Sequence, residues 1–192
     1  MITSRDLQAV EFINEFGAAT TEQIRQLFYE TGEDGKPIGQ SYTVCKRRLR
    51  EIIKDTNIKR KKGPVTNQYI YYVGSPTQRW HKALRTELYC RLKKMEGDLK
   101  LFEVEYALPG VKADAFFAYS YGGKGYLYFV EVELSNKGLD VAKYERLYLS
   151  KDHPFPVFPG ILVISDKKIK ANTKLKIIRV GTDFSNMEAI LK

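Results

Sequence analysis

Three helical patterns occupy most of the first 55 residues. Apolar residues recur at helical spacing over residues 4–16, again over 20–29, and once more over 41–55. Hydroxyl side chains stand at the start of each pattern and can cap a helix. Residues 30–40 between the second and third patterns are rich in glycine and acidic residues and contain Pro37, which predicts a loop. The apolar stripe expected on the first helix consists of Leu7, Val10, Phe12 and Ile13.

An extended pattern follows the third helix. The stretch "IKRKKGPVTNQYIYYVG" (residues 58–74) predicts two strands around a Gly-Pro turn. Three helices followed by a β-hairpin is the element order of a winged helix-turn-helix, a common DNA-binding domain. Gly74 and Pro76 then break regular structure, so we expect this first domain to span residues 1–75.

The remaining pattern mixes helices and strands. A helix is predicted up to about residue 96 with apolar residues at Trp80, Ala83, Leu84, Leu88, Leu92 and Met95. Strand-like segments follow at residues 100–108, 112–120 and 125–134, then a helix at 139–149, then strands at "PGILVIS" and "LKIIRVG". This αβββαβ order predicts an α/β (α+β) domain over residues 76–192.

Composition and charge narrow the class of protein. The chain has 192 residues, 43% of them hydrophobic, and no apolar run of about 18 residues, so we expect a cytoplasmic protein without a membrane partner. Cys45 and Cys90 lack the spacing of a metal site and are expected to be buried and free. The formal net charge is +9, and residues 36–62 hold ten lysines and arginines against only two acids. This concentration favours nucleic acid as the partner.

The third predicted helix carries its charge on one side. Its buried stripe is expected at Tyr42, Cys45, Leu49, Ile52 and Ile53. The candidates for contacts to base edges are Ser41, Thr43, Lys46 and Arg47, and those for contacts to phosphates are Arg50, Lys54, Lys59, Arg60, Lys61 and Lys62. Such binding to double-stranded DNA requires no cofactor. The alternative is a solvated helix face without a partner.

Two acidic residues stand close together at the end of a predicted core strand. In "YFVEVELSNKG", the two-residue period of a strand places Glu131 and Glu133 on one face. Two like charges side by side require a cation between them, either a metal ion or a basic side chain. We expect Lys143 in the next helix to be that counter-charge. Ion pairs to Lys112 or Lys137 are the alternative, and we expect no catalytic role for His81 or His153.

The arrangement of acids resembles the restriction-endonuclease-like, PD-(D/E)xK, nuclease fold. Asp114 in "VKADAFF" begins the second strand and Glu131 ends the third, which the resemblance implies are ligands of Mg²⁺ or Mn²⁺. The position that holds a lysine in that superfamily is Glu133 here, so we expect little or no nuclease activity. An active enzyme would be a metal-dependent DNA nickase. Its catalytic set would be Glu87, Asp114, Glu131, Glu133 and Lys143.

A second resemblance covers nearly the whole chain. The predicted winged helix followed by "HKALRTELY", "KADAFF", "YFVEVELSNKG" and "KYERL" resembles the replication-relaxation family of plasmids and integrative elements. It implies a DNA-binding accessory protein for replication, relaxation or conjugative transfer of a mobile element, in which the nuclease-like domain supports a homodimer or binds a relaxase or replication initiator. The chain departs from the usual "PD" by having Ala113 before Asp114. A transcriptional repressor with the same winged helix is the remaining alternative.

Overall fold

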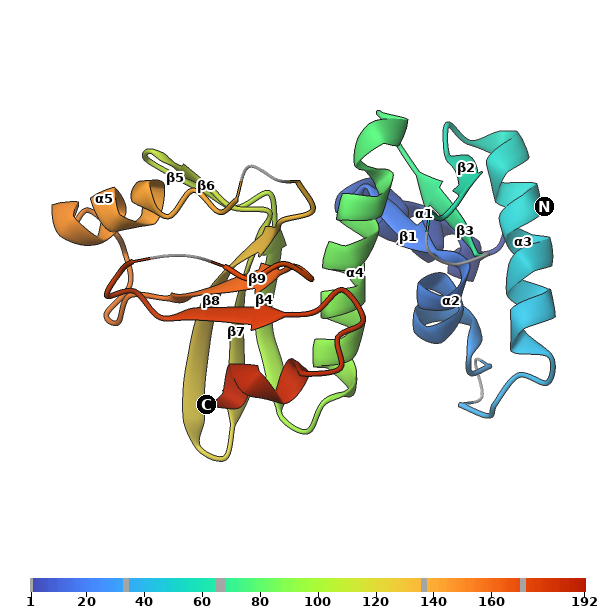
Figure 1. Cartoon of the computed structure of the whole chain (residues 1–192). Coiled ribbons are helices and arrows are strands. Elements are labelled where there is room, and N and C mark those ends of the chain that lie inside the picture. Colours follow the sequence, from blue (N-terminus) through green and yellow to red (C-terminus); the bar gives the residue numbers. More distant parts are fainter. Residues whose placement is uncertain (1, 33–34, 65–67, 136–137, 170–171) are drawn as a thin grey trace. The chain divides into compact units, whose positions relative to one another are not determined.

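The chain forms two compact units, residues 1–90 and 91–192 (Figure 1). The structure is a computed structural model that describes residues 2–32, 35–64, 68–135, 138–169 and 172–192. The predicted boundary at residues 75 and 76 falls inside the first unit. Most of the helix predicted to follow this boundary, which spans Arg79–Lys94, therefore belongs to the first unit and not to the second.

The first helix, α1 (Ser4–Phe16), has the predicted bounds. Thr3 caps it, and the Asp6 side chain accepts from the Thr3 backbone N–H in return, which satisfies two N–H groups at the helix start. Gly17 ends it with φ of 76°, a left-handed conformation that glycine adopts without strain. The prediction that Leu7 is buried was wrong, because its side chain is 52% exposed and the core contacts come from the neighbouring face.

The second helical segment also has the predicted extent but changes form along its length. α2 (Thr21–Ile24) starts at a capping box between Thr20 and Gln23, and continues as a π-helical turn, η1 (Arg25–Tyr29). The third helix, α3 (Ser41–Asp55), matches its prediction residue for residue. Its buried stripe is confirmed at Cys45, Leu49 and Ile52, whereas Ile53 is half-buried. Tyr42 is 41% exposed, so its predicted burial was wrong.

A small antiparallel sheet completes the part of the first unit that was predicted. β2 (Lys59–Lys62) pairs with β3 (Tyr69–Tyr72), which confirms the hairpin, while residues 65–67 of its turn lie outside the described residues. β3 also pairs with β1 (Ala18–Thr20), a short strand that the sequence did not predict. The strand order is β1-β3-β2, so β2 is an edge strand.

After a short 3₁₀ turn, η2 (Pro76–Gln78), the helix α4 (Arg79–Lys94) packs against α1 and β1 through polar as well as apolar contacts. Arg85 is 1% exposed and donates to the Phe16 carbonyl at 2.6 Å, where a cation complements the negative end of α1. Thr86 donates to the Ala18 carbonyl at 2.7 Å. These buried contacts tie α4 to the first unit as far as residue 90. Cys45 and Cys90 are both buried, as predicted.

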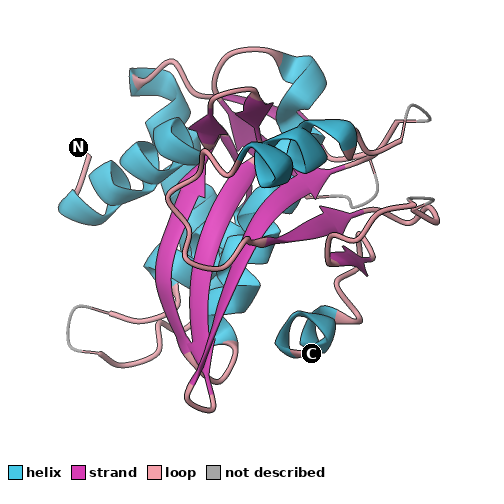
Figure 2. Ribbon diagram, turned by 90° about the vertical axis from the view of Figure 1, so that its left-hand side faces the viewer, coloured by secondary structure: helices cyan, strands magenta, loops and turns pink. Residues whose placement is uncertain are grey.

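The second unit is built on a mixed five-stranded sheet of order β10-β9-β8-β7-β4, whose long strands lie side by side in Figure 2. The strands are β4 (Asp98–Val104), β7 (Ala115–Tyr121), β8 (Lys124–Val132), β9 (Gly160–Ile164) and β10 (Ile177–Val180). β4, β7 and β8 are antiparallel neighbours, whereas β8, β9 and β10 run parallel. The predicted strand 100–108 is divided, because the backbone turns at Glu105 (φ 56°) into a small hairpin of β5 (Ala107–Leu108) and β6 (Val111–Lys112).

The helix α5 (Ala142–Ser150) connects β8 to the parallel strand β9 and packs on one face of this sheet. Tyr144 and Leu147 join a core with Phe116, Phe129 and Ile161. A short 3₁₀ helix, η3 (Met187–Leu191), ends the chain. The mixed α+β class is confirmed. Within the described residues, the helices are too short or too polar to cross a membrane.

Candidate nucleic-acid interface and buried acidic cluster

The outer face of α3 presents the basic residues that the sequence singled out. Thr43, Arg47, Arg50 and Lys54 are exposed, and Lys46 is half-buried with its ammonium 5.4 Å from the centre of the Tyr42 ring. The exposure of Tyr42 therefore provides a surface on which Lys46 rests. Lys54 also forms an ion pair with Glu51, three residues earlier, at 3.0 Å. This pair is exposed to solvent, so it contributes little to stability.

Ser41 at the start of α3 is less free than its candidate role assumed. Its hydroxyl accepts a hydrogen bond from Arg25 at 3.1 Å, and Arg25 itself is paired with Glu22 at 2.7 Å. These contacts hold the first turn of α3 against η1. Of the four predicted base readers, Thr43 and Arg47 are exposed and Ser41 and Lys46 are half-buried.

Arg48, on the same helix, points the other way. Its Nε donates to Asp6 Oδ1 at 3.0 Å, and a terminal nitrogen donates to Asp6 Oδ2. Asp6 is fully buried and also accepts from the Tyr29 hydroxyl at 2.7 Å. Sequence reasoning counted Arg48 only as one of ten basic residues. The spacing of Thr3 and Asp6, which is that of a capping box, was the signal that could have identified the buried carboxylate.

This buried ion pair has a clear electrostatic consequence. Burial acts to raise the pKa of the Asp6 carboxyl, but hydrogen bonds from Arg48, Thr3 and Tyr29 outweigh it and hold that pKa well below the usual range. The same burial, together with its hydrogen bond to Asp6, raises the pKa of Tyr29. Asp6 therefore stays ionised and locks α1, η1 and α3 together.

The edge strand β2 extends the basic surface. Lys59, Arg60, Lys61 and Lys62 are all exposed, although alternate residues of a strand point to opposite sides. Across the hairpin, the Arg60 guanidinium lies 4.8 Å from the centre of the Tyr69 ring. This contact holds one of the four cations in place on the hairpin surface.

In the second unit, Glu131 and Lys143 form the predicted ion pair. Lys143 Nζ lies 2.6 Å from Glu131 Oε1 and also donates to the Lys112 carbonyl at 2.6 Å. The Tyr144 hydroxyl donates to the same carboxylate oxygen at 2.5 Å. The end of strand β8 and the first turn of α5 thus share one polar cluster, and Lys143 is the counter-charge of Glu131, as expected.

The environment of this cluster shifts the ionisation of its members. Burial raises the pKa of Glu131, since the opposing effects of Lys143 and Tyr144 do not fully compensate, and the neighbouring charge of Asp114 adds to the increase. Burial and the charge of Glu131 raise the pKa of Tyr144. Tyr144 therefore acts as a neutral hydrogen-bond donor.

Asp114 lies beside this cluster, and Glu133 turns away from it. Asp114 precedes β7, and its Oδ2 accepts from the Val132 N–H at 2.7 Å across the β7–β8 pair. Strand β8 ends at Val132, and Glu133 Oε1 accepts from the backbone and hydroxyl of Ser135 at 2.7 and 2.6 Å. The strand predicted to reach residue 134 thus ends two residues early, although the Glu133 N–H still donates to the Ile164 carbonyl at 3.0 Å. The Glu133 carboxylate binds Ser135, while Lys143 pairs with Glu131.

Glu87, the remaining acid of the predicted catalytic set, belongs to the first unit. It accepts from the Gln23 side chain at 2.9 Å, which joins α4 to α2. Among the described residues, no group of three or more His, Cys, Asp and Glu side chains is arranged to hold a metal ion. His153 packs between Phe155 and Phe158, with ring centres 6.0 and 5.1 Å away. Lys137, an alternative partner for the acids, lies outside the described residues.

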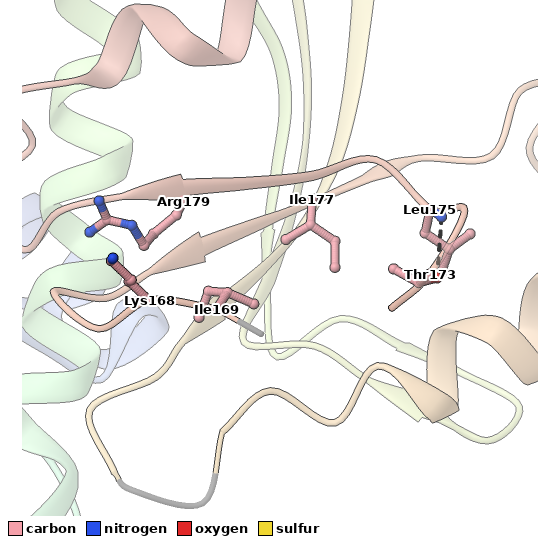
Figure 3. A pocket seen from close by; sticks show the side chains of 6 residues that line it. All are labelled: Lys168, Ile169, Thr173, Leu175, Ile177 and Arg179. Carbon is pink, nitrogen blue, oxygen red and sulfur yellow. Dashed lines mark hydrogen bonds between the residues drawn. The ribbon is translucent and has the colours of Figure 1, made fainter. Parts of the chain in front are cut away.

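A separate hollow of about 430 Å³ opens beside β10 (Figure 3). Ile169, Leu175 and Ile177 line it with apolar surface, and Lys168 and Arg179 lie at one end. Arg179 donates to the Ser165 carbonyl at 3.1 Å, which fixes its position. The apolar residues of this hollow also pack against the core under α5.

Comparisons of the chain with models of protein families, with curated proteins and with solved structures give no match. Both resemblances therefore stay predictions from motifs.

Proposed function

We propose that this protein binds double-stranded DNA through α3 and β2. Residues 4–72 of the first unit have the element order α1-β1-α2-η1-α3-β2-β3, with β2 and β3 forming a hairpin after the third helical segment. A winged helix has this order, and in such domains the third helix enters the major groove while the hairpin contacts the backbone. This element order supports the proposal, and so do the basic side chains on α3 and β2, which can bind the negatively charged DNA.

The observation that carries the proposal is that the arginines of α3 differ in their surroundings. Arg48 is used inside the unit, where it neutralises Asp6, whereas Arg47 and Arg50 extend from the exposed face. Neither Arg47 nor Arg50 forms an ion pair with another described residue. Cations left without an internal partner on a helix face are suited to phosphates and base edges.

The basic strand has a second explanation that must be separated from DNA binding. An exposed edge strand is prone to pair with another chain, and lysines are a common protection against that. Lys59, Lys61 and Lys62 would serve this purpose without any partner. The protective role predicts aggregation when the charges are removed, whereas DNA binding predicts a loss of affinity in a protein that stays monodisperse.

For the second unit, we propose a role in a replication, relaxation or transfer complex of a mobile element, as the motif resemblance implies. Its strand and helix order is compatible with a nuclease-like domain that serves as a scaffold for a homodimer, a relaxase or a replication initiator. A DNA nickase is the second candidate, because Asp114, Glu131 and Lys143 come together where β7 and β8 meet α5. Mg²⁺ or Mn²⁺ would be its cofactor.

Two assays separate these roles. Labelled duplexes from a plasmid origin, a transfer origin, a promoter and a random sequence are titrated with the protein, and supercoiled plasmid is incubated with it in Mg²⁺ or Mn²⁺. We expect duplex binding without nicking. Tight binding to a promoter alone would favour a repressor, metal-dependent nicking would favour the nickase, and no binding to any duplex would refute the proposal.

A further inference from the structure

A second pocket lies in the first unit, beside the basic face of α3. It has a volume of about 630 Å³ and opens to solvent. Its walls come from three parts of the chain that are distant in sequence: Thr3 and Arg5 at the start of α1, Tyr29 at the end of η1 with the nearby Gly32, and Val44, Arg47 and Arg48 on α3. Three of these seven residues are arginines.

The three arginines are in different states. Arg48 is held in position by a salt bridge in which it donates to both carboxylate oxygens of the buried Asp6. Arg5 rests over the ring of Tyr29, with its guanidinium carbon 5.9 Å from the ring centre. Neither Arg5 nor Arg47 forms an ion pair with another residue in the part of the chain that the structure describes. Among the described lining residues, the positive charge therefore exceeds what Asp6 neutralises.

We infer that this pocket receives a phosphate group of the DNA backbone, bound by Arg5 from α1 and Arg47 from α3. The inference rests on the proposed function, and it adds a contact from α1 that neither α3 nor β2 provides. A guanidinium group offers paired N–H donors that match two phosphate oxygens, and two such groups from different helices fix the anion from two sides. The Thr3 hydroxyl also lines the pocket, but it already donates its hydrogen to Asp6, so the two arginines are the proposed donors to the phosphate.

The position of Arg47 explains why a backbone phosphate suits this pocket. Arg47 lines the pocket and is also on the exposed face of α3 proposed to meet DNA. A phosphate held there would lie next to a duplex bound along α3, so one strand would be anchored at the start of α1. The hydrogen bond from Tyr29 to Asp6 holds the Tyr29 wall of the pocket in place, which lowers the entropy cost of binding.

The test compares Arg5→Ala with Arg5→Lys and with the control Lys124→Ala, which removes an exposed charge from the second unit. Duplex affinity is measured by fluorescence anisotropy over a range of salt concentrations, and thermal melting verifies folding. We expect Arg5→Ala to weaken binding about 3- to 10-fold for every duplex and to make the salt slope shallower by about one. Arg5→Lys should recover part of the affinity, and Lys124→Ala should behave as wild type.

The outcomes separate this inference from the proposed function. If wild type binds duplexes and Arg5→Ala binds them with unchanged affinity and slope, the pocket assignment is wrong and the proposed function stands. If wild type binds no duplex, the proposed function fails and the pocket assignment fails with it. Calorimetric titration with inorganic pyrophosphate is the second arm. Tight pyrophosphate binding that Arg5→Ala abolishes, with duplex affinity unchanged, would assign the pocket to a free phosphorylated molecule instead.

Discussion

Lys143 Nζ lies 2.6 Å from Glu131 Oε1, and the two side chains are only 17% and 15% exposed. The cation of this acidic cluster thus comes from α5 and not from the strand position two residues after the glutamate, where Glu133 turns to Ser135. The pair links β8 to α5 at the edge of the core. Its first role is structural, whatever chemistry the second unit supports.

Replacing Lys143 with Met should destabilise the protein, because Glu131 would remain a mostly buried carboxylate without its cation. We expect the free energy of unfolding to fall by about 2 kcal/mol at neutral pH, somewhat less than for a fully buried pair. Chemical denaturation measures this change. The double variant Glu131→Gln, Lys143→Met should lose less than the sum of the two single variants.

The effect of Lys143→Met should depend on pH in a definite direction. The folded-state pKa of Glu131 is already raised, so protonation favours the folded form, and this stability is lost as pH rises through that pKa. Removing Lys143 raises the pKa further. The destabilisation should therefore be largest near pH 8 and shrink as the pH falls toward about 5. A loss of unfolding free energy that does not change with pH would mean that the charges of Glu131 and Lys143 do not cause the destabilisation.

The sequence allowed the elements to be predicted better than their contacts. The bounds of α1 and α3 followed from capping residues and from Gly17, which act locally. The strand β1 is too short to show a period and exists only because β3 pairs with it. Tyr42 follows the apolar spacing of its helix but falls in the first turn, where its side chain is exposed.

The candidate site was also only partly predictable from the sequence. The pairing of Lys143 with Glu131 could be predicted because a carboxylate on a core strand requires a nearby cation, although the second acid, Glu133, binds Ser135 instead. The pairing of Arg48 with Asp6 could not, since the residues are 42 positions apart and Arg48 stands in a run of similar charges. Likewise, nothing local distinguishes the buried Arg85 from other helical arginines. Partners distant in sequence are set by packing and leave no periodic signal.

Asp6→Asn should destabilise the first unit through the loss of the ion pair with Arg48. We expect a loss of about 3 kcal/mol at pH 7, because Arg48 would lose its counter-charge. The folded-state pKa of Asp6 lies below its unfolded value, so its contribution is present above about pH 4 and is lost as the pH falls further. Thermal melts of the two proteins should thus converge in acid. A constant difference down to pH 2 would contradict the assigned ionisation.

Nuclease activity should be absent or weak in the unmodified protein, since Lys143 already occupies the Glu131 carboxylate and Glu133 is turned toward Ser135. Plasmid nicking is measured in Mg²⁺ and in Mn²⁺, with Asp114→Ala as the control. Glu133→Lys restores the charge order of PD-(D/E)xK enzymes, and nicking by this variant alone would indicate a latent metal site. Strong Mg²⁺-dependent cleavage by wild type that Asp114→Ala abolishes would establish the nickase instead.

Neutralising β2 should weaken DNA binding without changing sequence preference. Replacing Lys59, Arg60, Lys61 and Lys62 with Gln removes contacts to phosphates, so affinity should fall more than tenfold for specific and random duplexes alike, with a shallower salt slope. Light scattering on the same samples detects aggregation through the exposed edge. A loss confined to one sequence would make β2 a reader of bases. Aggregation with unchanged affinity would leave only the protective role.

The central claim is that the exposed face of α3 binds DNA, and the double variant Arg47→Ala, Arg50→Ala tests it most directly. The matched control is Lys93→Ala, Lys94→Ala, which removes two exposed charges from the last turn of α4. Duplex affinity and its salt dependence are measured for both by fluorescence anisotropy, after melting curves have shown that they fold. The account predicts at least a tenfold loss and a slope shallower by about two for the α3 variant, with the control unchanged. Equal affinities for wild type, the α3 variant and the control at matched salt would contradict it.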